Sequence, residues 1–150
     1  MRTRDEAFAD LLNESHRRLL GEPLVPADVP AGKMAEWLYD APFGLLVHDG
    51  SDDPVFIYAN QTAQKLFEYS WDEFVGLPSR LSAGEEDREE RRILLEGVRE
   101  KGFTTAYRGP RVARSGRRFF IDEVTVWNLA LDSGSVRTGQ GALIRRWEDG

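Results

Sequence analysis

Residues 55–74, VFIYANQTAQKLFEYSWDEF, decide the fold of this chain. The first five are apolar or β-prone and predict a buried strand that stops at Asn60. The side chain of Asn60 is placed to accept a hydrogen bond from the first turn of a following helix. Ser70 and Glu73 have the spacing of a capping box, which opens a second short helix. The stretch contains no nucleophile, metal cluster or phosphate-binding loop.

The region before this stretch predicts a separate helix and a connector. Apolar residues recur at helical spacing between residues 5 and 20, at Phe8, Leu11, Leu12, Leu19 and Leu20. Gly21 ends this amphipathic helix, and three prolines follow it. We therefore divide the chain into residues 1–33, the amphipathic helix with its Pro-rich connector, and residues 34–147, one compact domain. The domain begins with a helical turn at 34–39 and a strand at 43–48.

The region after the stretch predicts one more helix and then strands. Ser82 and Glu85 form a second candidate capping box before a charged helix at 87–101. The inward face of that helix is expected to carry Ile93, Leu94, Leu95 and Val98. Strand patterns follow at 103–107, 111–113, 118–129 and 139–147, with a turn at 132–135. The order predicts an α+β fold with a five-stranded antiparallel sheet and short helices on one face.

The longest strand has apolar residues on both faces. Alternation assigns one face to Phe119, Ile121, Glu123, Thr125, Trp127 and Leu129. The other face receives Phe120, Asp122, Val124, Val126 and Asn128. Because a sheet with one wet face does not show this pattern, the second face needs the N-terminal helix, another protomer or both. The pattern therefore predicts a homodimer.

Composition limits the classes of function. The chain has 150 residues, 41% of them hydrophobic and 31% charged, which fits one globular domain. Its net charge of −6 argues against general affinity for nucleic acid. The absence of cysteine excludes disulfides, thiolate metal sites and a cysteine-linked flavin. No apolar segment has the length of a signal peptide or a membrane helix, so we expect a cytoplasmic protein with no membrane partner.

A set of short motifs then connects the chain to a known family. In order, they are Trp37-Leu38-Tyr39, Ala41-Pro42-Phe43, Tyr58-Ala59-Asn60-Gln61-Thr62-Ala63, Leu66-Phe67-Glu68, Leu77-Pro78-Ser79-Arg80-Leu81-Ser82-Ala83, Arg88-Glu89-Glu90-Arg91, Tyr107-Arg108-Gly109, Gly116-Arg117-Arg118-Phe119, Val126-Trp127-Asn128-Leu129 and Gly139-Gln140-Gly141-Ala142. Residues 57–73 resemble the PAS superfamily in general. Over residues 37–143 the set resembles one branch of it, the MEKHLA domain, which also occurs as short stand-alone bacterial proteins.

The resemblance implies a PAS-like fold with a role in sensing or in regulated dimerisation. It implies no catalytic residues, so we expect a non-enzymatic protein. The family is similar to the C-terminal region of plant homeodomain-leucine zipper regulators. This chain lacks the homeodomain and the zipper, so no DNA-binding role transfers. The alternatives are an interaction module without a ligand and a small α+β enzyme.

A ligand between the helices and the sheet would need a few polar groups in an apolar pocket. The candidate binding residues are Tyr58, Asn60, Arg80, Tyr107, Glu123, Thr125, Trp127 and Gln140. Each has a structural alternative. Asn60 can be only a helix cap, and Trp127 can be core. Glu123 can lie near a strand end or pair with an arginine, and Arg80 can bond loop carbonyls or Glu68 instead of a ligand carboxylate.

Metal and haem sites are not expected. His48 and His16 are the two histidines, and His48 is expected to lie at a solvated strand end and not to bind haem. The acidic run at 85–90 is interpreted as a helix start, where carboxylates favour the helix dipole. A basic patch near the hairpin could bind an acidic partner or nucleic acid. It consists of Arg108, Arg111, Arg114, Arg117 and Arg118. Because the chain carries a net negative charge, we do not expect it to bind nucleic acid.

Overall fold

The computed structural model describes residues 3–130 and 139–150. Its strands in this part of the chain are β1 (Gly44–His48), β2 (Phe56–Ala59), β3 (Phe103–Val112), β4 (Arg118–Leu129) and β5 (Gly139–Asp149). They form one antiparallel sheet in the order β2-β1-β5-β4-β3. The predicted α+β fold with a five-stranded antiparallel sheet is confirmed. The turn predicted at 132–135 lies outside the described residues.

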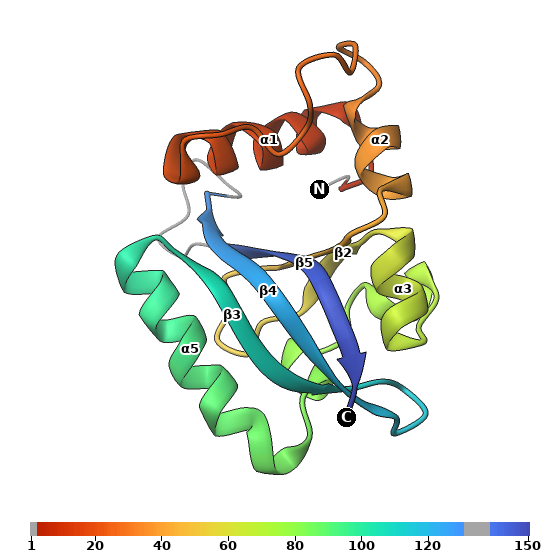
Figure 1. Ribbon diagram of the computed structural model, residues 1–150, viewed down its shortest axis with the longest axis vertical. Helices are drawn as coiled ribbons and strands as arrows, with labels where there is room; N and C mark the ends of the chain where they lie inside the picture. Colours follow the sequence, from red (N-terminus) through yellow and green to blue (C-terminus); the bar gives the residue numbers. More distant parts are fainter. Residues whose placement is uncertain (1–2, 131–138) are drawn as a thin grey trace.

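Helices cover both faces of this sheet (Figure 1). They are α1 (Glu6–Leu20), α2 (Met34–Asp40), α3 (Gln61–Phe67), α4 (Trp71–Phe74), the 3-10 turns η1 (Ser79–Ser82) and η2 (Glu85–Asp87), and α5 (Arg88–Lys101). We call the face that packs against α3, α4 and α5 the inner face, and the face that packs against α1 and α2 the outer face. Each face has its own apolar core, one centred on Phe67, Phe74 and Phe119 and the other on Leu12 and Trp127.

The polar residues of the deciding stretch are explained by capping. The side chain of Asn60 accepts a hydrogen bond from the Ala63 N–H, and Ser70 and Glu73 form the predicted capping box. The second predicted box, at Ser82, is wrong. The Ser82 hydroxyl donates to the Ser79 carbonyl instead, and the turn η2 separates it from the first residue of α5. A 3-10 entry therefore replaces a side-chain cap at this helix.

The inward stripe of α5 differs from the prediction at two positions. Ile93 is 58% exposed, and Arg91 is buried. Arg91, Leu94, Leu95 and Val98 have the spacing of one helical face, and Ile93 lies off it. A charged residue, Arg91, thus lies within the buried stripe of α5. This stripe packs against the inner face of the sheet.

The two faces of β4 also differ from simple alternation. Phe119, Ile121, Val124 and Val126 all lie in the inner core, whereas Trp127 and Leu129 lie in the outer core. The face assignment that grouped Phe119 with Trp127 is therefore wrong. The cause is Glu123, whose φ of 51° is left-handed, because alternation restarts on its far side. The neighbouring strand β3 has its own register shift nearby, with Ala106 at a φ of 58°.

The N-terminal helix supplies the layer that the apolar outer face needs. The indole Nε1 of Trp127 donates to Ser15 Oγ at 3.0 Å, and the ring of His16 meets the indole edge-on at 5.2 Å between centroids. Gly141 lies opposite Trp127 in the sheet, and a Cβ there would come within 2.9 Å of the indole. Because α1 of the same chain covers this face, the face does not require a second protomer. The homodimer stays a prediction.

Candidate ligand-binding site

A small cavity lies on the inner face of the sheet, under α5 and η1. Its volume is about 40 Å³. Most of its wall is apolar and comes from Leu46, Phe56, Val124, Val126 and Ile144, among others. The polar part of its wall comes from His48, Arg91, Tyr107, Arg111 and Gln140. We call this space the inner cavity. It has the composition expected of a small-molecule site, with a few polar groups in an apolar surround.

Arg91 brings a positive charge to this cavity from α5, with Glu90 and Tyr107 as its nearest favourable electrostatic neighbours. It is 8% exposed, and within the described residues it makes no hydrogen bond or ion pair. Burial, followed by repulsion from Arg111, lowers the pKa of Arg91 to about 9. A buried charge without a partner costs stability, and proteins normally pair such groups. Its presence here requires another explanation than folding.

Arg111 brings a second positive charge from β3. Its guanidinium donates to the Tyr107 hydroxyl at 3.2 Å and to the Pro110 carbonyl at 2.6 Å. The Tyr107 hydroxyl in turn donates to the exposed carboxylate of Glu90, and burial raises the pKa of Tyr107. In the predicted basic patch the other four arginines have carboxylate partners: Arg108 with Asp122 and Glu148, Arg114 with Glu73, Arg117 with Glu68 and Asp149, and Arg118 with Glu86. Arg111 is thus set apart from them by burial.

His48 and Gln140 add free hydrogen-bond acceptors. His48 Nδ1 lies 2.9 Å from the Asp49 carbonyl, which places the proton on Nδ1 and leaves Nε2 as a buried acceptor without a partner. Burial lowers the pKa of His48 to about 4, so its ring is neutral at pH 7. Gln140 Nε2 donates to the Leu95 carbonyl, and its Oε1 has no partner. The expectation that His48 is solvated is wrong, because its side chain is buried where α5 covers this strand end.

The inner cavity adjoins a groove at the surface. This groove, of about 590 Å³, lies between α5, η1 and the loop at 51–54. His48, Arg91, Leu95 and Gln140 line both spaces. We call the outer space the α5 groove. The shared side chains therefore separate the cavity from the groove and from solvent.

Three of the eight residues predicted from sequence meet at this site. Tyr107 and Gln140 line the inner cavity, and Arg80 lines the α5 groove. Arg80 pairs with Asp53 at 3.2 Å in an exposed contact. Its alternative partner Glu68 pairs with Arg117 instead.

The other five predicted residues lie elsewhere. Asn60 is fully buried, accepts from the Leu45 and Ala63 N–H groups, and donates to the carbonyls of Leu38 and Phe43. Trp127 is core, and Thr125 lies on the outer face, where it accepts from Arg145. Glu123 is exposed at the irregularity in β4 and pairs with Arg146. Their side chains thus have structural partners away from the inner cavity.

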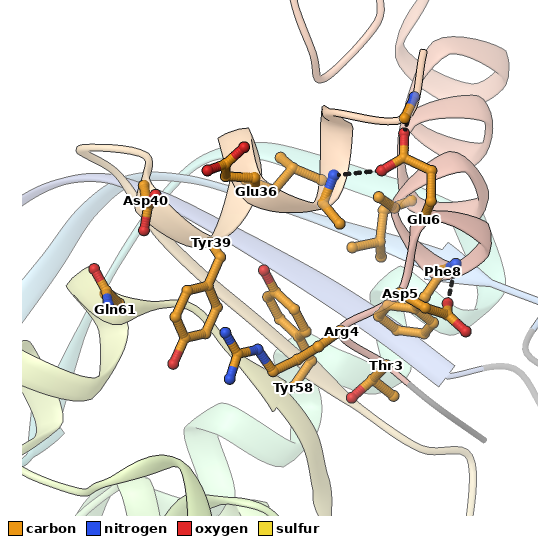
Figure 2. A pocket seen from close by; sticks show the side chains of 15 residues that line it. Thr3, Arg4, Asp5, Glu6, Phe8, Glu36, Tyr39, Asp40, Tyr58 and Gln61 are labelled. Atoms are coloured by element: carbon orange, nitrogen blue, oxygen red, sulfur yellow. Dashed lines mark hydrogen bonds between the residues drawn. The ribbon is translucent and has the colours of Figure 1, made fainter. Parts of the chain in front are cut away.

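Tyr58 lines a different groove, on the outer side of the molecule (Figure 2). This outer groove, of about 560 Å³, lies between residues 3–6, α1 and α2. The guanidinium of Arg4 lies 3.7 Å from the centre of the Tyr39 ring, and Glu6 accepts from the N–H groups of Gly32, Met34 and Ala35. These backbone bonds lower the pKa of Glu6. Arg4 and Glu6 of this groove therefore have partners within the chain.

Sequence reasoning missed Arg91 and treated Arg111 only as part of a basic patch. Both carried a signal. Arg91 stands at helical spacing from Leu94, Leu95 and Val98, so a charge occupies an apolar stripe. Arg111 alternates with Tyr107 through Gly109 along one strand, which places the two on the same face. A charged residue within an otherwise apolar sequence pattern is therefore the signal that could have indicated this site.

The arrangement of sheet and helices defines a class of protein by its fold, the PAS-like fold. Solved structures with this fold resemble the chain. A PAS domain from a two-component sensor histidine kinase has 19% identity and a TM-score of 0.60, over 73% of this chain and 89% of that one. A PAS domain from Colwellia psychrerythraea has 16% identity and a TM-score of 0.63, over 74% and 92%. The LOV domain of a blue-light activated histidine kinase from Erythrobacter litoralis has 23% identity and a TM-score of 0.56, over 69% and 95%.

Within that class the chain belongs to the MEKHLA domain family, whose sequence model matches residues 6–149. The matched segment includes α1 as well as the sheet. No curated protein matches the chain in sequence. In the part of the chain that the structure describes, no helix is long and apolar enough to cross a membrane.

Proposed function

We propose that this protein is a non-enzymatic sensory domain that binds a small molecule in the inner cavity. The observation that carries the proposal is the polar lining of that cavity, where two buried acceptors lack partners beside Arg91, which makes no hydrogen bond or ion pair within the described residues. Groups of this kind are normally satisfied in a folded protein, because each unpaired one costs about 1–3 kcal/mol. A ligand that enters from the α5 groove would supply the missing partners. A cytoplasmic location stays part of the proposal.

The size of the inner cavity supports a small ligand. A volume of about 40 Å³ holds roughly three water molecules, and a flavin ring system is far larger. Binding would stabilise the packing of α5 on the inner face, because α5 contributes Arg91 and Leu95 to the wall. A ligand that prefers one packing of α5 shifts the population toward it. The output of the sensor would then be the position of this helix.

Native mass spectrometry of freshly purified full-length protein tests the proposal. We expect a species heavier than the bare chain by the mass of a small molecule. Ala142→Leu should remove that species, because Ala142 lines the cavity and a larger side chain would fill it. Ala7→Leu is the matched control, since it adds the same atoms at an exposed position of α1. No added mass in the wild type, or added mass that persists in Ala142→Leu, would contradict the proposal.

The second candidate is an interaction module that forms a homodimer. The observation in its favour is the edge strand β3, which among the described residues pairs only with β4 and carries Phe103 at 38% exposure. Ile93 is exposed on α5, which packs beside this strand (Figure 1). An exposed edge can pair with another chain. The same native mass spectrum tests this second candidate. A dimer that dissociates in the Ile93→Lys variant would support this surface. A monomer at all concentrations would exclude it.

A further inference from the structure

We propose that the ligand of the inner cavity is a short-chain hydroxycarboxylate of the size of glycolate or lactate. This inference rests on the proposed function and adds the chemical class of the ligand. Arg91 and Arg111 would hold the carboxylate, and the ligand hydroxyl would donate its one hydrogen bond to one of the two free acceptors, Gln140 Oε1 and His48 Nε2. The chemical class of the ligand follows from the charged groups, the hydrogen-bond acceptors and the apolar walls of the cavity.

The two arginines that line the cavity, Arg91 and Arg111, favour an anionic ligand. Arg91 has no partner among the described residues, and Arg111 has only the Tyr107 hydroxyl and a backbone carbonyl. The nearest acidic side chain in this network is Glu90, which is exposed and is held by Tyr107. Two buried guanidinium groups therefore face a space that no carboxylate of the described chain enters. Planar guanidinium groups match a carboxylate, which can accept two parallel hydrogen bonds.

The acceptors call for a hydroxyl in addition to the anion. Gln140 Oε1 and His48 Nε2 are both buried and unpartnered, and both residues line the cavity. The orientation of the Gln140 amide is fixed by its donation to the Leu95 carbonyl, and the tautomer of His48 follows from the Asp49 carbonyl. A plain carboxylate cannot satisfy these acceptors, because it has no proton to donate. A hydroxycarboxylate has both groups within a few bonds.

The remaining walls limit the size and exclude inorganic oxyanions. Leu46, Val126 and Ile144 face the same space, and its volume leaves room for only a few heavy atoms. Phosphate or sulfate would place charged oxygens against these apolar side chains, which is costly. A short carbon chain would instead contact them. The ligand would lie next to the α5 groove at Arg91, His48 and Gln140, which line both spaces.

Isothermal titration of the full-length protein tests this inference with three probes. Lactate carries both groups, propionate lacks the hydroxyl, and lactamide lacks the charge. We expect lactate to bind best, with propionate weaker by about tenfold and lactamide weaker still. Arg91→Met should weaken lactate binding by roughly tenfold or more, whereas Arg99→Met should change it by less than about twofold. Arg99 is the matched control, because it is an exposed arginine of the same helix that lines only the α5 groove.

Each contrary outcome has a definite meaning. Equal binding of lactamide and lactate, or an unchanged lactate affinity in Arg91→Met, would overturn the inference and leave the inner cavity as a ligand site. Absence of lactate and glycolate binding up to about 10 mM would overturn it as well. A different molecule found in the native mass spectrum would then preserve the proposed function without this ligand class. Circular dichroism of Arg91→Met is the control that separates a loss of binding from a loss of structure.

Discussion

The two faces of the sheet are both buried, yet they are built differently. On the outer face, α1 packs closely over Trp127, whose single polar atom is bonded to Ser15, and Arg4 and Glu6 of the outer groove have partners in the chain. On the inner face, α5 covers a cavity where His48 and Gln140 leave buried acceptors unpaired beside Arg91. His16 Nε2 is the exception on the outer side. The comparison indicates that the outer face serves stability and the inner face accepts a ligand at some cost in stability.

The largest expected effect tests the outer face. Trp127→Ala removes a fully buried indole and should destabilise the protein by about 3–5 kcal/mol. Trp147→Ala, at a position 40% exposed on β5, should cost less than about 1 kcal/mol. Urea unfolding followed by far-UV circular dichroism measures both. Similar losses for the two variants would contradict the assignment of Trp127 to the centre of the outer core.

The next effect concerns pH and the inner face. The pKa of His48 falls from 6.5 to about 4 on folding, so the unfolded chain takes up the proton first. Stability is therefore unaffected above pH 6.5 and is lost as the pH falls toward 4, by about 3 kcal/mol in total. Carboxylates titrate in the same range, so the measurement is the difference between wild type and His48→Gln across this window. A constant difference would show that His48 is not buried as a neutral ring.

A smaller effect is an increase in the free energy of unfolding. Arg91→Met replaces an unpaired buried charge with an apolar side chain of similar length and should stabilise the ligand-free protein by about 2 kcal/mol. The pKa of Arg91, lowered to about 9, implies that the wild type recovers part of this difference as the pH rises above 9. Thermal unfolding of both proteins at pH 7 and pH 10 checks the prediction. Destabilisation at pH 7 would mean that Arg91 has a structural partner.

The smallest effect concerns the rim. Arg80→Ala breaks an exposed ion pair with Asp53 and should cost less than about 1 kcal/mol of stability. It should also leave lactate affinity within about twofold of wild type, because Arg80 lines the α5 groove and not the cavity. Titration calorimetry on this variant measures the effect. A large loss of binding would move the ligand from the cavity to the groove.

The fold was more accessible from sequence than the site. Caps at Asn60 and Ser70, strand patterns and the apolar helix at the N-terminus are local signals, and each was confirmed. The two faces of β4 were harder, because one left-handed residue, Glu123, reverses the alternation and nothing in its identity announces that. The site depends on Arg91 and Arg111, which are far apart in sequence and converge only when α5 packs on β3. Composition cannot reveal that convergence.

The most direct test of the two-faced account is a nuclear magnetic resonance titration of the labelled protein with lactate. We predict shifts in the guanidinium resonance of Arg91, the side-chain amide of Gln140 and the backbone amides around His48. The indole N–H of Trp127, held by Ser15 on the outer face, should not move. Shifts confined to exposed arginines, or shifts as large at Trp127 as at Gln140, would contradict the assignment of ligand binding to the inner cavity.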